Sequence, residues 1–196
     1  EDYQRFLRIK SLPRYLFRGG RAEIPIEYAT AIGLEAPKRP SGDYMPSRWL
    51  FDYQRDIARM AIRRRKFAVF ADCGLGKTAI MLEFAKHVHG LHPSGRVLIV
   101  SPLMVVAQTV QEAERFYGKR MKVQRITSSE LAEWLRTGTG IAITNYDAIR
   151  DDLPHSDLAA LILDESSMLK SHYGAWGTRL IEMGRGVEYK LCLTGT

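Results

Sequence analysis

The sequence predicts an α/β domain with a mostly parallel sheet and helices on both faces. Two observations carry this prediction. Short apolar runs alternate with helical patterns from residue 48 onward, and a glycine-rich turn joins one such run to an apolar helix. Alternating strands and helices form parallel sheets, because each helix returns the chain to the start of the next strand. Ligands of such sheets bind beyond the carboxyl ends of the strands, so functional residues are expected where the apolar runs end.

The composition is that of a globular protein, with 45% of the 196 residues hydrophobic and 26% charged. No run of about 18 apolar residues is present, and the first residues lack the layout of a signal peptide, so we expect a soluble, cytoplasmic protein with no membrane partner. Cys73 and Cys192 fit a reducing compartment better than a disulfide or a metal framework. The net charge of +7 fits a polyanionic partner and, equally well, a solvated basic surface.

Residues 1–46 are predicted to be an N-terminal extension, and residues 47–196 the main domain. Prolines and glycines interrupt every long pattern in the extension. Its first 21 residues hold six basic side chains against two acidic ones, with four aromatic residues among them. This mixture could bind a phosphate backbone, or it could be a strap whose aromatic side chains pack on the main domain.

The main domain is expected to open with a helix over residues 48–65, with Ser47 as its cap. The helix ends in three arginines and a lysine, residues 63–66. We prefer to interpret this run as favourable charge at a helix C-terminus rather than as a nucleic-acid contact, because it enters the next strand at the end opposite the glycine-rich turn. That strand, residues 67–71, is expected to be fully buried.

The glycine-rich turn predicts a phosphate-binding loop. Gly74 and Gly76 let the backbone direct its N–H groups toward phosphate oxygens at the start of a helix. Lys77 would reach the β- and γ-phosphates of ATP, and the hydroxyl of Thr78 would bind Mg²⁺. The full pattern has a glycine where Ala71 stands, and a chance Gly-Lys-Thr in an ordinary strand–turn–helix is the alternative.

Apolar residues recur at helical spacing after the turn, at Met81, Phe84, Ala85, Val88 and Leu91. They predict a buried helix that Gly90 would end. Three histidines, at 87, 89 and 92, lie near its terminus. No carboxylate or cysteine stands at ligand spacing beside them, so a metal site there is the minor alternative.

The remaining elements alternate in the same way. We expect a strand at 97–100, a helix at 103–117 and a strand at 121–126. A capping box at 127–130 then opens a helix that Gly138 ends. Three further strands are expected, at 141–144, 158–163 and 189–193, each followed by polar residues.

Asp164 and Glu165 complete the requirements for ATP hydrolysis. Both follow an apolar strand, which would place Asp164 where it can hold Mg²⁺ and Glu165 where it can orient or deprotonate water. A solvated acidic pair at a strand end is the alternative.

These motifs, in this order, resemble the N-terminal RecA-like lobe of superfamily two helicases, and most closely the Swi/Snf-type members found in phages and prophages. The resemblance covers residues 48–196. It rests on Gly-Leu-Gly-Lys-Thr, Asp-Glu-Ser-Ser followed by Lys170, Thr-Asn-Tyr-Asp, Leu-Thr-Gly-Thr and Leu-Phe-Asp-Tyr-Gln-Arg-Asp from residue 50.

The resemblance implies a RecA-like fold and a set of roles. It implies that the strand ending at Thr194 lies between two others: the strand that leads into the glycine-rich turn and the strand that precedes Asp164. The ATP-binding residues would be Gln54, which would contact adenine, and Cys73, Gly74, Leu75, Gly76, Lys77, Thr78 and Ala79. The nucleic-acid contacts would be Ser101, Pro102, Thr144, Asn145 and Tyr146. Coupling of the ATP state to movement would fall to Thr194, Gly195 and Thr196.

The leading hypothesis is the ATP-binding lobe of a DNA-stimulated ATPase that translocates on, or remodels, duplex DNA. A second lobe, which would supply arginine fingers, is expected to be missing from this sequence, and Arg179 is the one internal substitute we consider. The alternatives are a helicase that separates DNA or RNA strands and a non-catalytic, nucleotide-gated binding module. The module should have lost Lys77 or Glu165, and both are present.

Overall fold

The computed structural model describes residues 2–13, 15–24, 28–34, 43–169 and 174–195. The chain forms two compact units, Glu1–Pro40 and Ser41–Thr196. The first contains helix α1 (Asp2–Lys10), a hairpin of β1 (Leu16–Arg18) and β2 (Arg21–Glu23), and the short 3-10 helix η2 (Thr30–Ile32). Gly19 and Gly20 both have positive φ, as a tight two-residue hairpin turn requires.

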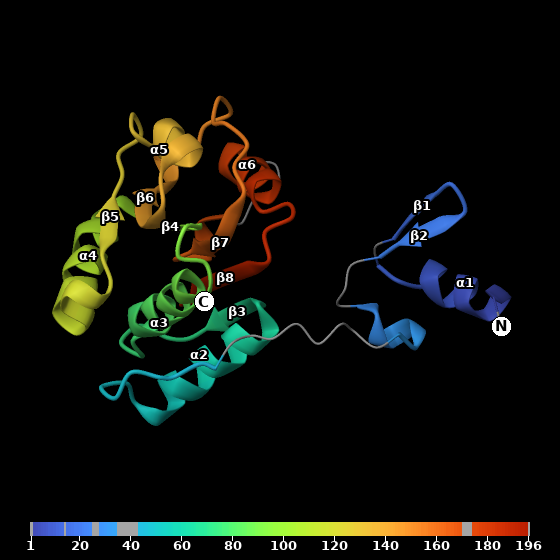
Figure 1. The fold of residues 1–196 in the computed structure, drawn as a ribbon, viewed down its shortest axis with the longest axis horizontal. Helices are drawn as coiled ribbons and strands as arrows, with labels where there is room; N and C mark the ends of the chain where they lie inside the picture. Colours follow the sequence, from blue (N-terminus) through green and yellow to red (C-terminus); the bar gives the residue numbers. More distant parts are fainter. Residues whose placement is uncertain (1, 14, 25–27, 35–42, 170–173, 196) are drawn as a thin grey trace. The chain divides into compact units, whose positions relative to one another are not determined.

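The second unit is a six-stranded parallel sheet with the strand order β3-β8-β7-β4-β6-β5 (Figure 1). Its strands are β3 (Lys66–Phe70), β4 (Arg96–Ser101), β5 (Val123–Arg125), β6 (Gly140–Asn145), β7 (Leu158–Leu163) and β8 (Tyr189–Thr194). Its helices are α2 (Asp52–Arg64), α3 (Lys77–Leu91), α4 (Leu103–Tyr117), α5 (Leu131–Thr137) and α6 (Ala175–Met183). Short 3-10 helices follow three of these elements: η3 (Gly118–Arg120), η4 (Tyr146–Ala148) and η5 (Ser166–Leu169).

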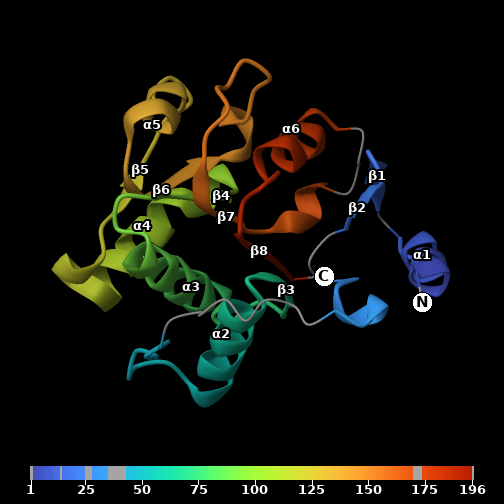
Figure 2. The same cartoon turned by 45° about the vertical axis from the view of Figure 1, so that its right-hand side comes forward.

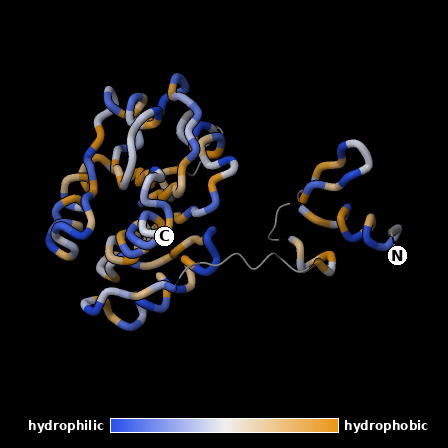
Figure 3. Tube along the Cα trace, viewed as in Figure 1, coloured by the Kyte–Doolittle hydropathy of each residue, from blue (hydrophilic) through white to orange (hydrophobic). Residues whose placement is uncertain are grey.

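Helices cover both faces of this sheet. Helices α2, α3 and α4 pack on one face, and α5 and α6 on the other (Figures 1 and 2). Strand β4 shows why: Val97 and Ile99 point into the first layer, and Leu98 and Val100 into the second. Because β4 is buried on both faces, it is continuously apolar rather than alternating. Hydrophobic stretches accordingly run along the strands in the middle of the unit (Figure 3). None of the described helices is long and apolar enough to cross a membrane.

The predicted fold class is confirmed, and so is the predicted position of β8 between β3 and β7. The prediction that residues 67–71 form a fully buried strand is wrong. Strand β3 lies at the edge of the sheet, and the side chain of Phe70 is 77% exposed. Only Val69 of this strand is buried. Local sequence does not distinguish an edge strand from a central one, because the order of strands is set by the whole topology.

Two helix boundaries also differ from the prediction. Helix α2 begins at Asp52, so Ser47 is not its cap, and helix α3 continues through Gly90 to Leu91. The capping box at Thr127 is partly confirmed, since Glu130 accepts a hydrogen bond from the Thr127 backbone N–H at 2.9 Å. Helix α5 ends at Gly138 as predicted.

A buried carboxylate on α3 ties the segment before α2 to the first helical layer. Glu83 is fully buried and accepts hydrogen bonds from the hydroxyls of Tyr44, at 2.8 Å, and Tyr117, at 2.7 Å, and from Ser47. Lys86 pairs with it at 2.8 Å. Burial alone would raise the pKa of Glu83, but these donors outweigh it and the pKa is lowered from its ordinary value.

This network predicts an acid-side loss of stability. A folded pKa below the ordinary value of 4.5 means that Glu83 stabilises the fold fully above that pH and loses the contribution as pH falls through the folded pKa. Glu83→Gln should lower the free energy of unfolding at neutral pH by about 2 kcal/mol and reduce its decline in acid. Urea unfolding over a pH series measures both. Glu114→Gln, at an exposed position on α4, is the control, and equal curves for the two variants would contradict the account.

Candidate active site

The glycine-rich turn lies at the carboxyl end of β3, where the backbone turns from strand to helix. Gly74 and Gly76 adopt φ of 86° and 70°, a region that favours glycine, and α3 begins directly after Gly76. The start of α3 therefore directs the positive end of its dipole toward the turn. In its first turn the N–H groups of Ala79 and Ile80 donate to the Gly76 carbonyl, at 3.0 and 3.4 Å. Residues 72–75 are exposed, and Cys73 is a free thiol. Ala79, in the first turn of α3, is buried and packs the helix start.

The ammonium group of Lys77 lies across this turn. It donates hydrogen bonds to the carbonyl oxygens of Ala71, at 2.8 Å, and Asp72, at 3.4 Å. A Cβ at Gly195 would lie 3.5 Å from the Lys77 nitrogen, so the chain beyond β8 also borders the turn. The cation is thus centred where phosphates bound by the turn would lie.

Asp164 follows β7 at the same edge of the sheet. One of its carboxylate oxygens accepts a hydrogen bond from Ser101 at 2.8 Å, and the other accepts one from the Glu165 backbone N–H at 3.1 Å. Burial raises the pKa of Asp164, and the Ser101 bond and the positive charge of Lys77 oppose that shift. Two hydrogen bonds thus hold the Asp164 carboxylate within the field of the Lys77 charge.

Glu165 is the other carboxylate of the pair and is held in an unusual backbone conformation. Its φ is 49°, in the left-handed region that non-glycine residues seldom adopt. Its side-chain oxygen accepts hydrogen bonds from Ser167, at 2.5 Å, and Thr194, at 3.1 Å. The Ser167 bond is the main cause of its lowered pKa, and the Gly195 N–H and the charge of Lys77 act in the same direction. An ionised carboxylate of low pKa orients water better than it removes a proton.

The chain after β8 connects these groups. Thr194 is buried, pairs with Phe70 of β3 and donates its hydroxyl to Glu165. Its carbonyl accepts a hydrogen bond from the backbone N–H of Ala71 at 3.1 Å. Thr194 therefore bonds both to Ala71, where the turn begins, and to the Glu165 carboxylate. Thr196, which we also expected to couple ATP state to movement, lies outside the described residues.

Gln54 lies against the turn from α2. Its side chain is buried, accepts a hydrogen bond from the Phe51 N–H at 3.1 Å and donates to the Leu75 carbonyl at 3.3 Å. The Tyr53 hydroxyl donates to the same carbonyl at 3.2 Å, and the rings of Phe51 and Tyr53 stack with centroids 5.9 Å apart. The contact of Tyr53 with the turn was not predicted from the sequence, although Phe51 and Tyr53 stand close to Gln54 in it.

The residues expected to contact nucleic acid divide into two groups. Ser101, Thr144 and Tyr146 are buried and bond internally, to Asp164, to the Ile126 carbonyl and to the Asp164 carbonyl respectively. Their side chains are therefore not at a surface. Pro102 and Asn145 are partly exposed, and Asn145 lines a depression of about 230 Å³ with Leu103 and Ser128.

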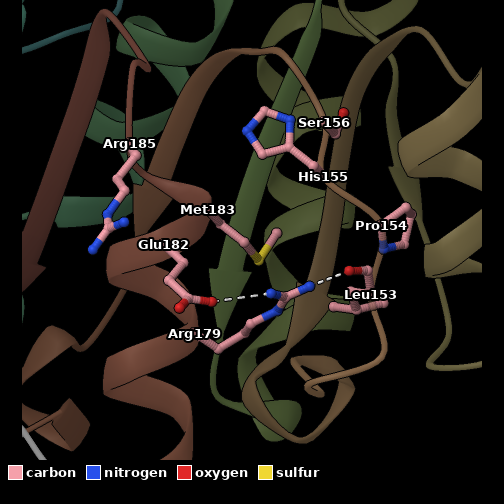
Figure 4. Close-up of a pocket in the computed structure, with 8 residues that line it drawn as sticks. All are labelled: Leu153, Pro154, His155, Ser156, Arg179, Glu182, Met183 and Arg185. Carbon is pink, nitrogen blue, oxygen red and sulfur yellow. Dashed lines mark hydrogen bonds and ion pairs between the residues drawn. The ribbon is translucent and has the colours of Figure 1, made fainter.

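A larger pocket, of about 380 Å³, lies elsewhere (Figure 4). Its lining residues belong to the segments before β7 and β8, at the amino end of the sheet: Leu153, Pro154, His155, Ser156, Arg179, Glu182, Met183 and Arg185. It is thus opposite the edge that carries the glycine-rich turn.

Arg179 lines this second pocket and forms hydrogen bonds there. It donates to the Leu153 carbonyl and to Glu182, the latter at 3.1 Å (Figure 4). It also donates to the Arg150 carbonyl at 3.1 Å. Its guanidinium group fastens the loop before β7, so the idea that it replaces an arginine finger is not supported.

The donor groups fit Mg²⁺. Thr78 at the start of α3 offers a hydroxyl and Asp164 a carboxylate, both hard oxygen ligands, and each Asp164 oxygen retains lone pairs beyond its one hydrogen bond. In the described part of the chain, no three His, Cys, Asp or Glu side chains gather to hold a metal ion by themselves. A metal at Thr78 and Asp164 would complete its shell with water and phosphate, as Mg²⁺ usually does.

Comparison with known proteins agrees with this geometry. A family model described as DEAD/DEAH box helicase matches residues 51–196. The Arabidopsis thaliana protein named ATP-dependent DNA helicase DDM1 is 26% identical over 136 residues, which cover 63% of this chain and 18% of that protein.

Solved structures share the fold. The Sulfolobus solfataricus SWI2/SNF2 ATPase core, determined in complex with dsDNA, matches with a TM-score of 0.65 and 19% identity over 81% of this chain and 34% of that one. The UvsW helicase of bacteriophage T4 matches with a TM-score of 0.56 and 15% identity, covering 74% of this chain and 52% of that one. The Pyrococcus furiosus Hef helicase domain matches with a TM-score of 0.58 and 21% identity, covering 74% of this chain and 32% of that one. This chain therefore spans between about a fifth and a half of the length of these relatives.

The likeness to the T4 protein concerns the fold alone, because the two sequences are only 15% identical. The expected closeness to phage members is therefore supported only at the level of the fold. The family model, in contrast, matches most of the sequence, including the glycine-rich turn, the Asp164–Glu165 pair and the strand before Thr194. The chain belongs to the DEAD/DEAH box helicase family.

Proposed function

We propose that this chain is the ATP-binding lobe of a DNA-stimulated ATPase that translocates on, or remodels, duplex DNA. The observation that carries the proposal is the meeting of Lys77, Asp164, Glu165 and Thr194 at one edge of the sheet. Family membership implies nucleotide use. Duplex DNA is supported by the matched fold of the Sulfolobus SWI2/SNF2 core, which was solved with dsDNA.

In this proposal, the backbone N–H groups of Gly74 to Ala79 cradle the phosphates of ATP. Lys77 exchanges the carbonyls of Ala71 and Asp72 for phosphate oxygens, since it is already centred over the turn. Thr78 and Asp164 would hold Mg²⁺, which supplies positive charge against the charge that develops on the transferred phosphoryl group. Gln54 would contact adenine after one of its present bonds opens.

Glu165 would orient the attacking water. Its carboxylate is fixed by Ser167 and Thr194, and its lowered pKa keeps it ionised at neutral pH. Through Thr194, a change at the γ-phosphate would be transmitted to the chain after β8. This gives Thr194 and Gly195 their proposed coupling role.

The nucleic-acid contact is proposed at the depression beside Asn145 and Pro102, which lies after β4 and β6 at the carboxyl edge of the sheet. The buried Ser101, Thr144 and Tyr146 would support this surface from beneath. The free thiols of Cys73 and Cys192 support the expected cytoplasmic location.

A second RecA-like lobe is also part of the proposal. Phosphoryl transfer leaves negative charge that Lys77 and Mg²⁺ only partly neutralise, and Arg179 is held elsewhere. An arginine from another lobe would supply the remainder. Strand separation is the second candidate function, because the Arabidopsis relative is named an ATP-dependent DNA helicase.

Two substitutions should separate binding from hydrolysis. Lys77→Ala should weaken ATP binding about tenfold or more, because a charge directed at the phosphates is lost. Glu165→Gln should bind ATP normally and hydrolyse it about a hundredfold more slowly, because the amide has similar size but no negative charge. Calorimetry and single-turnover hydrolysis measure the two effects. Equal loss of ATP binding in both variants would refute the separate roles.

Steady-state ATPase assays test the function as a whole. Residues 1–196 should turn ATP over on the order of a thousandfold more slowly than the same lobe in a protein with its second lobe, which is the usual effect of a missing arginine finger. Duplex DNA should accelerate only the two-lobed protein. DNA-stimulated turnover by residues 1–196 at the full rate would refute the two-lobed motor. A strand-displacement assay on the two-lobed protein would show whether it separates strands or only translocates.

A further inference from the structure

We propose that the N-terminal unit binds single-stranded nucleic acid through a row of exposed aromatic rings with basic side chains around it. This site is distinct from the residues used above and does not depend on the nucleotide chemistry. The row consists of Tyr3 and Phe6 on α1 and of Phe17 and Tyr15 at the start of the hairpin.

The four rings form a continuous series. Tyr3 and Phe6 have centroids 6.5 Å apart and nearly stacked planes, Phe6 and Phe17 are 5.4 Å apart, and Phe17 and Tyr15 are 5.5 Å apart. Phe6 lies beside Tyr3 because it stands three positions later on the same side of α1, and it also contacts Phe17 of the hairpin. Tyr15 and Phe17 share one side of the extended chain because they are two positions apart.

These rings are not the core of the unit. Among the residues of this unit that the structure describes, the buried apolar side chains are Ile9, Ala29 and Ile32. The exposed fractions are 69% for Tyr3, 38% for Phe6 and 39% for both Tyr15 and Phe17. Four adjoining aromatic side chains that remain this exposed form a surface for a partner rather than an interior.

Positive charge lies on and beside this surface. The ammonium of Lys10 is 5.0 Å from the centre of the Phe6 ring. Arg18 follows Phe17 and stands directly opposite Arg21 in the hairpin register, next to the turn. Like charges in this position repel each other, and neither arginine forms an ion pair within the described residues. A bound phosphate would remove that repulsion.

Single-stranded nucleic acid satisfies both features together. Aromatic rings stack unpaired bases without regard to sequence, and neighbouring cations hold the backbone phosphates. A duplex keeps its bases stacked on one another, so it would engage the cations and leave the rings unused. An acidic peptide would likewise leave the row of rings unexplained.

The aromatic test uses the full chain and a short fluorescein-labelled oligothymidylate. Tyr3→Ser with Tyr15→Ser should weaken binding at least about tenfold, because base stacking on both rings is lost. Tyr3→Phe with Tyr15→Phe keeps the rings and should bind almost as well as the wild type. Phe6 and Phe17 stay intact in both variants, so the contact between α1 and the hairpin is preserved.

The charge test uses Arg18→Gln with Arg21→Gln. The dependence of log affinity on log salt should become shallower by about 0.7 for each phosphate contact that is lost. Arg63→Gln with Arg64→Gln removes the same charge from exposed positions at the end of α2 and should leave that slope unchanged.

Unchanged oligothymidylate binding in both the serine and the glutamine variants would overturn the proposal. So would equal weakening in the serine and phenylalanine variants. A lower melting temperature of the whole chain with unchanged binding in the serine variant would instead show that the rings pack on protein.

Discussion

Everything at the candidate active site depends on β8 lying between β3 and β7. In a parallel sheet, neighbouring strands end at the same edge, and the register fixes how far each reaches. Phe70 pairs with Thr194, and Leu163 pairs with Cys192. The glycine-rich turn, the Thr194–Gly195 step and the Asp164–Glu165 pair therefore begin side by side, although they are separated by long stretches of sequence.

The same arrangement explains the strained backbone at Glu165. A non-glycine residue at positive φ costs on the order of 1 kcal/mol or more and persists only where its surroundings hold it. Here Ser167, Thr194 and the Gly195 N–H all bond to the Glu165 carboxylate. Removal of β8 from its place between β3 and β7 would take away two of these three contacts, those from Thr194 and Gly195. The backbone conformation of Glu165 thus depends on the position of β8 in the sheet.

Local sequence patterns were sufficient to locate most helices and strands of the main domain. Strands β4, β6 and β7 are continuous apolar runs, and the turn before α3 needs glycine at two positions, so each could be located from neighbouring residues alone. The strand order, in contrast, came from the resemblance to helicase lobes. The edge position of β3 was missed because burial of a strand depends on what pairs with it.

Long-range side-chain contacts were the other class of feature that sequence reasoning missed. Ser47 was assigned to a helix cap, but it bonds to Glu83, which lies 36 positions further along the chain. Ser101, Thr144 and Tyr146 were assigned to a nucleic-acid surface because the resemblance to helicase lobes implies that role. In the fold the hydroxyls of all three are bonded internally, two of them to Asp164, and only packing decides which way such side chains turn.

A crystal structure of the chain with Mg²⁺ and a non-hydrolysable ATP analogue would test the central claim most directly. The account predicts that the phosphates lie on the backbone N–H groups of residues 74–79. Lys77 should have moved from the Ala71 and Asp72 carbonyls to the phosphates, and the metal should lie between Thr78 and Asp164. Nucleotide bound instead in the pocket lined by Arg179 and Arg185, at the opposite edge of the sheet, would contradict it.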